Sequence, residues 1–246
     1  SMQEAVERHE AIVTALRLAI ARQQFALHYQ PQFDVQGRCV AVEALLRWNH
    51  PERGLQYPAT FLREAEETGL IEPIGQWVIG QALAQQARWS RRPGFEGLRM
   101  SVNVSARQFR GEEFVKAVAR ALDANATAPG RLTLELTESI LLDSPEEAGA
   151  RMQALRELGV NLALDDFGTG YSSLSYLTRL PLDEIKIDRA FVSRMEHESG
   201  EAAIVQAILA VAIRLSLRVV AEGVETEAQL RQLKLHGCNL FQGYLL

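Results

Sequence analysis

The sequence predicts an α/β fold in which eight strands close into a (β/α)₈-type barrel, with the first strand antiparallel to the rest. The chain has 246 residues, close to the roughly 250 that are typical of such a barrel. Strand-like and helix-like segments alternate along it, as expected for parallel strands joined by helical crossovers. Only residues 33–39 separate the first two strands. Because a parallel crossover needs about a dozen residues or more, this pair must form a hairpin.

The chain opens with a predicted amphipathic helix over Gln3–Gln24. Apolar residues such as Ile12, Leu16 and Ile20 recur there at helical spacing, and the helix is expected to cover one end of the barrel. The predicted strands are Phe25–Gln32, Val40–Trp48, Leu98–Val104, Leu132–Thr137, Asn161–Asp165, Glu184–Ile187, Arg218–Ala221 and Asn239–Leu245. The remaining predicted helices are Pro58–Trp89 with a break near Gly69–Pro73, Glu112–Asp123, Pro145–Leu158, Ser172–Arg179, Glu201–Leu215 and Glu227–Leu235.

The composition excludes several classes of function. A net charge of −5 argues against a protein that binds DNA or RNA polymers non-specifically, since such binding needs a basic surface. No apolar run reaches the roughly 18 residues of a membrane-spanning helix. The two cysteines, Cys39 and Cys238, make neither a disulfide framework nor a Cys-x-x-Cys metal motif, which favours a cytoplasmic setting. No Gly-x-Ser-x-Gly motif is present, which excludes the common serine hydrolases.

Polar side chains occur in or just after the last half of successive strands. They are Glu43, Asn103, Glu135, Asp165, Lys186, Glu222 and Gln242. Alternate residues of a strand point to opposite faces, and the spacing of these residues predicts that they share the inward face. A single acid at a strand end is as typical of a helix cap as of a catalytic site, but caps would not follow the inward pattern on strand after strand. Catalytic groups collect at this end of a barrel, so the set forms the candidate site.

The charge of this set predicts bound metal ions. Together with the adjacent Asp166, its acids carry −5 if ionised, and Lys186 offsets one charge, which leaves −4; the acids counted are Glu43, Glu135, Asp165, Asp166 and Glu222. Crowded carboxylates take up protons unless cations neutralise them, and two divalent ions would balance this charge. Oxygen ligands suit Mg²⁺ or Mn²⁺. The five histidines show no paired metal spacing, which argues against zinc.

Eight motifs occur in a specific order and spacing. They are Tyr29-Gln30-Pro31, Glu43-Ala44-Leu45, Asn103-Val104-Ser105, Glu135 to Ser139, Asp165 to Ser173, Lys186-Ile187-Asp188, Ala221 to Thr226 and Gln242-Gly243-Tyr244. In this order they resemble the EAL-domain cyclic di-GMP phosphodiesterases, from about Leu16 to Leu246. The resemblance implies a modified TIM barrel whose first strand is antiparallel to the rest. It also implies hydrolysis of cyclic di-GMP to linear pGpG with two Mg²⁺ or Mn²⁺ ions, and inhibition by Ca²⁺.

The resemblance implies roles for individual residues. The implied metal ligands are Glu43, Asn103, Glu135, Asp165 and Asp166, with Glu222 acting directly or through water. Lys186 corresponds to a lysine that contacts the attacking water, and Gln242 to a glutamine near it. Arg47 corresponds to an arginine that holds the substrate phosphate, with Leu45 beside it on the same strand face. The implied catalytic residues are Glu43, Asp165, Lys186 and Glu222, and whether Glu222 accepts a proton or only supports a metal is left open.

The resemblance also has implications beyond the site. Glu138 corresponds to a glutamate that tethers the loop beginning at Asp166, and this loop and the following helix are tied in the family to activity control and homodimer formation. The chain divides into an N-terminal helix or linker, residues 1–24, and the phosphodiesterase barrel, residues 25–246. We expect an upstream sensor or diguanylate cyclase domain, in a parent protein that can be tethered to a membrane. The family usually continues beyond Tyr244 through a Phe and a Pro, so a truncated C-terminal tail is expected to lower activity.

Two other functions stay open from the sequence. EAL-like domains that have lost metal ligands only sense cyclic di-GMP, whereas every matched ligand position is filled here, which favours an enzyme. An enolase-like metal enzyme fits the fold alone but not the motif order. Among the lesser residues, Asp188 is equally suited to cap a helix. Tyr29, Gln30 and the tryptophans Trp48, Trp77 and Trp89 are expected to serve packing rather than ligand binding.

Overall fold

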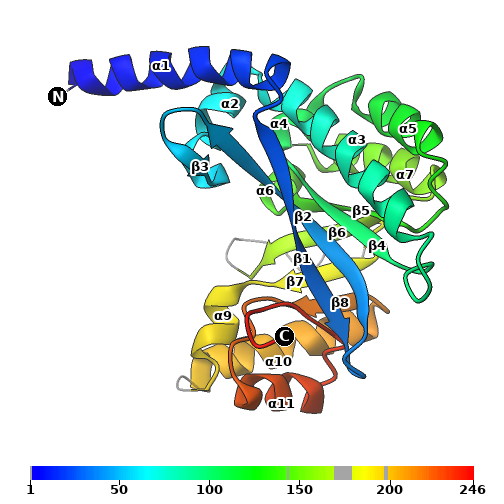
Figure 1. The fold of residues 1–246 in the computed structure, drawn as a ribbon. Coiled ribbons are helices and arrows are strands. Elements are labelled where there is room, and N and C mark those ends of the chain that lie inside the picture. The colour runs from blue at the N-terminus through cyan, green and yellow to red at the C-terminus, as the bar shows by residue number, and fades with distance from the viewer. Residues whose placement is uncertain (1, 143, 169–178, 197–198) are drawn as a thin grey trace.

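The structure, a computed structural model, describes residues 2–142, 144–168, 179–196 and 199–246 (Figure 1). The strands are β1 (Phe25–Asp34), β2 (Cys39–His50), β3 (Gly54–Gln56), β4 (Arg99–Val104), β5 (Leu132–Thr137), β6 (Asn161–Phe167), β7 (Glu184–Ile187), β8 (Arg218–Ala221) and β9 (Leu240–Phe241). The helices before β6 are α1 (Met2–Ala21), the short 3₁₀ helix η1 (Pro58–Thr60), α2 (Leu62–Thr68), α3 (Ile71–Trp89), α4 (Ala106–Arg110), α5 (Phe114–Ala124), α6 (Ser139–Leu142) and α7 (Pro145–Glu157). The later helices are α9 (Arg189–Arg194), α10 (Ser199–Arg214) and α11 (Glu227–Leu235).

Eight of the strands close into a barrel. They pair in the order β1-β9-β8-β7-β6-β5-β4-β2, and β1 pairs with β2 to complete the ring. β1 is antiparallel to both of its neighbours, and every other pair in the ring is parallel. The predicted fold class and the reversed first strand are therefore confirmed. β3 lies outside the ring, antiparallel to the last residues of β2.

The turn that reverses β1 is held by one aspartate. Asp34 Oδ1 accepts hydrogen bonds from the backbone N–H groups of Gln36 and Arg38, both at 2.9 Å. Gly37 has a φ of 77°, in the left-handed region that glycine adopts without steric cost. The turn returns the chain at once into β2, so β1 has no room for the helical crossover that joins the parallel strands.

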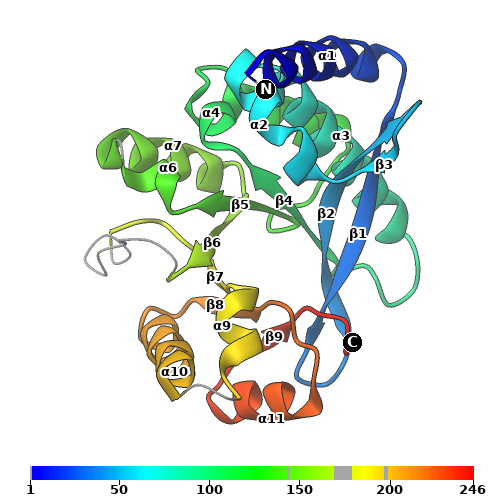
Figure 2. The same ribbon diagram turned by 90° about the vertical axis from the view of Figure 1, so that its left-hand side faces the viewer.

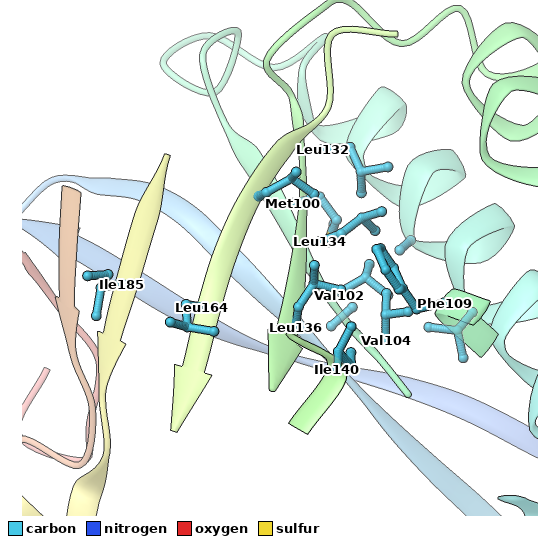
Figure 3. Packing of buried hydrophobic residues seen from close by; sticks show 14 of the residues in the cluster. Met100, Val102, Val104, Phe109, Leu132, Leu134, Leu136, Ile140, Leu164 and Ile185 are labelled. Atoms are coloured by element: carbon cyan, nitrogen blue, oxygen red, sulfur yellow. The ribbon is translucent and has the colours of Figure 1, made fainter. Parts of the chain in front are cut away.

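Helices lie around the outside of the barrel (Figures 1 and 2), and the main hydrophobic cluster is formed by buried residues of both the strands and these helices. On β4, Met100, Val102 and Val104 are buried and point away from the barrel axis, and Figure 3 shows them beside the outward leucines of β5. Phe109 of α4 packs among them. The residues between these positions, such as Ser101 and Glu135, must therefore point into the barrel, because strand side chains alternate. The barrel interior is polar, and its contents determine what the protein can do.

The N-terminal helix α1 packs against α2 at one end of the barrel. Its buried residues Ile12, Leu16 and Ala19 belong to the main hydrophobic cluster, in keeping with the expected covering role. Among the helices of the described residues, none has both the length and the apolar content needed to cross a bilayer.

The last strand is shorter than predicted. The sequence indicated Asn239–Leu245, but β9 contains only Leu240–Phe241. A Cβ atom on Gly243 would lie 2.1 Å from the carbonyl oxygen of Val224, so the chain passes close to the segment after β8. The Val224 N–H donates to Gln242 O at 3.0 Å and the Leu245 N–H donates to Val224 O at 3.1 Å. These bonds to a loop replace the bonds that would have extended the strand.

Several short elements were missed by the sequence pattern. Helices α4, α6 and α9 contain 5, 4 and 6 residues, which is too short for a helical apolar repeat to be recognised. β3 contains 3 residues. The break predicted near Gly69–Pro73 occurs at Gly69, which ends α2 with a φ of 78°. The helix predicted over Ser172–Arg179 lies, except for its last residue, outside the described residues.

We expect Gly243→Ala to destabilise the protein by about 3 kcal/mol, because a methyl group there would overlap backbone atoms of Val224. The matched control is Gly80→Ala in α3, where nothing lies within 4 Å of the added Cβ atom. That change should stabilise the protein by about 0.5–1 kcal/mol through helix propensity. Urea unfolding measures both free energies. Equal effects of the two substitutions would contradict the close approach at Gly243.

Candidate active site

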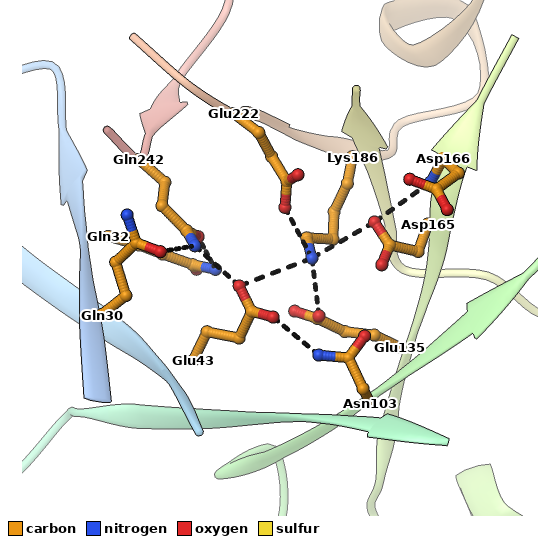
Figure 4. A network of polar contacts seen from close by, with 10 residues as sticks. All are labelled: Gln30, Gln32, Glu43, Asn103, Glu135, Asp165, Asp166, Lys186, Glu222 and Gln242. Carbon is orange, nitrogen blue, oxygen red and sulfur yellow. Dashed lines mark hydrogen bonds and ion pairs between the residues drawn. The ribbon is translucent and has the colours of Figure 1, made fainter. Parts of the chain in front are cut away.

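A buried lysine lies at the centre of the polar cluster inside the barrel (Figure 4). Lys186 of β7 is 1% exposed. Its Nζ atom lies 2.6 Å from Glu135 Oε2 and 2.7 Å from Glu222 Oε1. It also lies 3.2 Å from Asp165 Oδ1 and 3.7 Å from Glu43 Oε2. One ammonium group therefore bridges carboxylates from β2, β5, β6 and the end of β8.

Amide side chains hold the carboxylate of Glu43 from both sides. Asn103 Nδ2 donates to Glu43 Oε1 at 2.6 Å, and Gln242 Nε2 donates to Glu43 Oε2 at 2.6 Å. Gln242 Nε2 also donates to Gln30 Oε1 at 3.0 Å, and Gln242 Oε1 accepts from Gln32 Nε2 at 2.9 Å. Gln30, which we expected to serve strand packing, thus reaches the site. Gln32 was not predicted at all, although it shares the face of Gln30 two residues along β1.

The register of the barrel strands brings these side chains together. Asn103 pairs with Glu135 across β4 and β5, and Asp165 pairs with Thr137 across β5 and β6. On the other side Lys186 pairs with Val220 across β7 and β8. Because the strands are parallel, their carboxyl ends lie at one mouth of the barrel, where the structure places the predicted residues. All seven inward residues singled out from the sequence belong to this one cluster.

Burial and crowding control the protonation of the cluster. Burial raises the pKa of Glu135 well above its usual range, and the neighbouring Glu43 adds to the effect. Burial works in the same direction at Glu43, but Lys186 and the amides of Gln242 and Asn103 outweigh it and lower that pKa. Burial disfavours the charged form of Lys186, yet Glu135 and the other acids hold its pKa well above the ordinary value. The lysine is charged, and one of its carboxylate partners is poorly stabilised as an anion.

Glu222 and Asp166 have carboxyl groups that titrate near neutral pH. Burial raises the pKa of Glu222 to about 7, against the opposing effect of Lys186. Burial, Asp165 and Asp188 raise the pKa of Asp166 to about 6. Asp166 has a φ of 54°, and its backbone N–H donates to Asp165 Oδ1 at 3.0 Å. Asp188 caps α9 by accepting the Ala190 N–H at 2.7 Å, so it both caps a helix and borders the site.

The donor set suits divalent cations, although the lysine occupies its centre. Among the described residues, no group of three or more His, Cys, Asp or Glu side chains is arranged to hold a metal ion. Glu135 Oε1 is nevertheless buried with no hydrogen-bond partner among the described residues, and burial raises the pKa values of Glu135 and Glu222 despite their contacts with Lys186. Carboxylate and amide oxygens are the ligands that Mg²⁺ and Mn²⁺ prefer. The residues therefore fit such ions if Lys186 releases some of its carboxylate partners.

Two cavities open at this mouth. One, of about 240 Å³, is lined by part of the polar cluster, including Glu43, Lys186 and Glu222, and is also bordered by Leu45, Arg189, Glu225 and Tyr244. Arg189 was not predicted; its Nη2 atom lies 3.0 Å from Glu225 Oε1 at the cavity rim. The second, of about 350 Å³, shares Leu45 with the first and is lined mostly by apolar side chains such as Pro58 and Leu62. A ligand with both charged and apolar parts would suit this pair of cavities.

Two predicted polar residues of the site, Arg47 and Glu138, lie outside the polar cluster of Figure 4. Arg47 is half-buried, donates from Nη1 to Leu46 O at 2.8 Å and has its guanidinium carbon 4.7 Å from the ring centre of Tyr57. Its Nε atom is buried without a partner in the described residues. Glu138 is buried and accepts the Gly168 N–H at 3.0 Å, at the start of the loop that it was expected to tether. Most of that loop lies outside the described residues, so the control and dimer roles stay predictions.

The tryptophans serve packing, as predicted. The ring centre of Trp48 lies 5.5 Å from that of Phe61, and Trp77 lies 5.9 Å from Phe25. Trp89 lies 4.8 Å from Tyr29 in an edge-to-face contact, which also accounts for Tyr29. These aromatic pairs are distinct from the polar cluster of the barrel.

Comparison with known proteins agrees with this geometry. The family model described as "EAL domain" matches residues 13–246. The chain is 45% identical, over its whole length, to the "Bifunctional diguanylate cyclase/cyclic di-GMP phosphodiesterase MucR" of Pseudomonas aeruginosa, and it covers 36% of that protein. It is 42% identical over 99% of its length to the "Cyclic di-GMP phosphodiesterase PdeR" of Escherichia coli, of which it covers 37%. The chain thus spans about a third of the length of these relatives.

Solved structures share the fold closely. The structure described as "PaMucR Phosphodiesterase, c-di-GMP complex" has a TM-score of 0.92 and 46% identity, with 96% of each chain covered. The FimX EAL domain from Pseudomonas aeruginosa bound to c-di-GMP has a TM-score of 0.87 and 25% identity, with 96% of this chain and 94% of that chain covered.

We expect Glu222→Gln to stabilise the metal-free protein above pH 7 and to have little stabilising effect near pH 4.5. The pKa of Glu222 rises on folding from the ordinary 4.5 to about 7, so the folded state binds this proton more tightly than the unfolded state. The corresponding stability is fully present below pH 4.5 and is lost as the pH rises to about 7. Urea unfolding of both proteins in a chelator, at pH 5 and pH 8, measures the difference. A difference that does not grow with pH would contradict the raised pKa.

Proposed function

The chain belongs to the EAL domain family, and from this premise we propose that it is a metal-dependent phosphodiesterase that hydrolyses cyclic di-GMP to linear pGpG. Relatives described as cyclic di-GMP phosphodiesterases align over 99% or more of this chain. The observation that carries the proposal is the complete set of inward oxygen donors around Lys186. A barrel interior with this excess of buried carboxylate is costly to fold unless cations are to be bound there.

We propose that two Mg²⁺ or Mn²⁺ ions occupy the cluster. The residues that would hold them are Glu43, Asn103, Glu135, Asp165, Asp166 and Glu222. Bound divalent ions polarise phosphoryl oxygens and make water a stronger nucleophile at neutral pH. Ca²⁺ is expected to inhibit, because it accepts more ligands at longer and more variable distances than Mg²⁺.

The remaining steps are assigned to the residues of the chain. Lys186 would orient the attacking water through Nζ and offset negative charge that develops on the phosphoryl oxygens as the 3′ oxygen departs. Its burial keeps this charge unscreened by solvent. Glu222 would accept the proton of that water, because a carboxylate with a pKa near the working pH is an effective base.

The substrate would be held by residues around the two cavities. The mostly apolar cavity beside Leu45 has the character needed to bury the ring of a nucleobase. Arg47 has a buried Nε donor that no group of the described residues satisfies, and its planar guanidinium suits a phosphate. Gln242, which donates a hydrogen bond to Glu43, lines the smaller cavity of about 240 Å³.

The setting of the domain is also proposed. The E. coli "Oxygen sensor protein DosP" is 42% identical over 99% of this chain, which covers 30% of DosP. We therefore propose an upstream sensor or diguanylate cyclase domain in the parent protein. A cytoplasmic location agrees with the two free cysteines, Cys39 and Cys238. A homodimer through the loop and helix after Asp166 is retained as part of the proposal.

A catalytically weak sensor of cyclic di-GMP is the second candidate. It is favoured by one observation: among the described residues, Lys186 forms ion pairs with the carboxylates, and no group of three or more side chains is arranged to hold a metal ion. A sensor would bind the dinucleotide with this arrangement unchanged.

Purified protein incubated with cyclic di-GMP and Mg²⁺ or Mn²⁺ decides between the two candidates. We expect pGpG to accumulate, with none formed in chelator or by Glu43→Ala, which removes a carboxylate that the amides of Asn103 and Gln242 hold in place. Chromatography of the nucleotide products is the measurement. Binding of cyclic di-GMP without any pGpG would favour the sensor.

We expect Lys186→Met to lower kcat by about 10²–10³-fold while the KM for cyclic di-GMP changes much less. Methionine keeps the side-chain volume in the fully packed interior but removes the charge that acts in the transition state. Steady-state kinetics with Mn²⁺ separates the two constants. An increase in KM with kcat unchanged would assign Lys186 to substrate binding instead.

A further inference from the structure

Gln32 is the most deeply buried polar residue near the site that no step above uses. Its exposed fraction is 0%. It lies on β1, where Phe33 pairs with Phe241 and Asp34 with Leu240. If this antiparallel register is continued by one residue toward the start of β1, Gln32 lies opposite Gln242, the residue that follows the end of β9. The β1–β2 ladder also shifts register directly after Gln32, so the strand bends at this residue.

The hydrogen bonds of Gln242 allow one orientation of its amide. Ionised Glu43 can only accept hydrogen bonds, so the group that faces Glu43 Oε2 at 2.6 Å must be the Gln242 NH₂. Its second hydrogen goes to Gln30 Oε1 at 3.0 Å. The Gln242 oxygen must then face Gln32, whose Nε2 donates to it at 2.9 Å. Gln32 supplies the donor that keeps the amide from turning over.

We propose that Gln32 is a positioning residue of the catalytic site: it locks the Gln242 amide with its NH₂ group toward Glu43 and so fixes the Glu43 carboxylate for metal binding. The inference rests on the proposed function and adds a residue to it. Gln32 does not itself line the cavity, and among the described residues its side chain bonds to Gln242 rather than to a carboxylate. It acts through Gln242.

The burial of Gln32 supports a role beyond packing. Its Oε1 atom is buried without a hydrogen-bond partner in the part of the chain that the structure describes, so the side chain carries an unsatisfied acceptor that an apolar residue of the same size would avoid. Among the described residues, its side chain forms a hydrogen bond to Gln242 alone. The unpaired oxygen of Gln32 lowers the stability of the fold, whereas its Nε2 group provides the hydrogen bond to Gln242.

The first experiment compares Gln32→Met with a matched control, Gln86→Met. Methionine approximates the length of glutamine but has no N–H donor. Gln86 is also buried, at 3% exposure, and uses its amide for one bond, to Leu98 O at 3.0 Å, far from the cluster. Calorimetric titration with Mn²⁺ alone gives metal affinity, and turnover of cyclic di-GMP gives kcat. We expect Gln32→Met to weaken Mn²⁺ affinity and to lower kcat by about 10-fold or more, as for other residues that orient metal ligands. Gln86→Met should match the wild type in both.

The second experiment tests whether Gln32 acts through Gln242. In a double-mutant cycle with Gln242→Leu, we expect Gln32→Met to cause little further loss of Mn²⁺ affinity, because the amide it orients is already absent. Additive losses, or a Gln32→Met protein that binds Mn²⁺ and turns over like Gln86→Met, would overturn the inference while the proposed function stands. A wild-type protein that neither binds Mn²⁺ nor cleaves cyclic di-GMP would overturn both.

Discussion

The buried contact between Lys186 and its carboxylates is the interaction on which the rest of the site depends. The Lys186 Nζ atom lies within 3.2 Å of oxygens from Glu135, Asp165 and Glu222. These groups lie inside a barrel whose helices and outward apolar residues keep solvent away. One positive charge cannot neutralise this many acids. Burial raises the pKa values of Glu135 and Glu222, and the positive charge near them is too small to offset this effect. Divalent ions would supply the missing positive charge.

The antiparallel first strand, β1, contributes the glutamines that support Gln242 of the cluster. Because β1 runs antiparallel to β2 and β9, Gln30 lies opposite Glu43 in the β1–β2 register, and Gln30 and Gln32 both form hydrogen bonds with Gln242. Amides suit this position, since they both donate and accept hydrogen bonds without adding charge. Glu43 is held both by Lys186 and by the neutral donors of Asn103 and Gln242. Lys186 and, to a smaller extent, these amides lower the pKa of Glu43 although the side chain is buried.

Much of the fold and most of the site followed from the sequence, for identifiable reasons. The short link between β1 and β2 required a hairpin, and the alternation of polar and apolar residues placed Asn103, Glu135 and Lys186 on one inner face. What could not be predicted depends on contacts between distant segments. β9 ends early because Gly243 meets Val224. Gln32 matters only because β1 and β9 are neighbours, and Arg189 reaches the cavity rim across Gly223, where a Cβ atom would lie 2.3 Å from its side chain.

The central claim is that dications complete the charge balance of the barrel interior. Anomalous diffraction from crystals grown with Mn²⁺ and cyclic di-GMP tests it most directly. We expect two manganese peaks among Glu43, Asn103, Glu135 and Asp165, with the lysine nitrogen withdrawn from at least one carboxylate that it now contacts. A bound dinucleotide with no manganese peak, and with Lys186 still bridging Glu135 and Glu222, would contradict it.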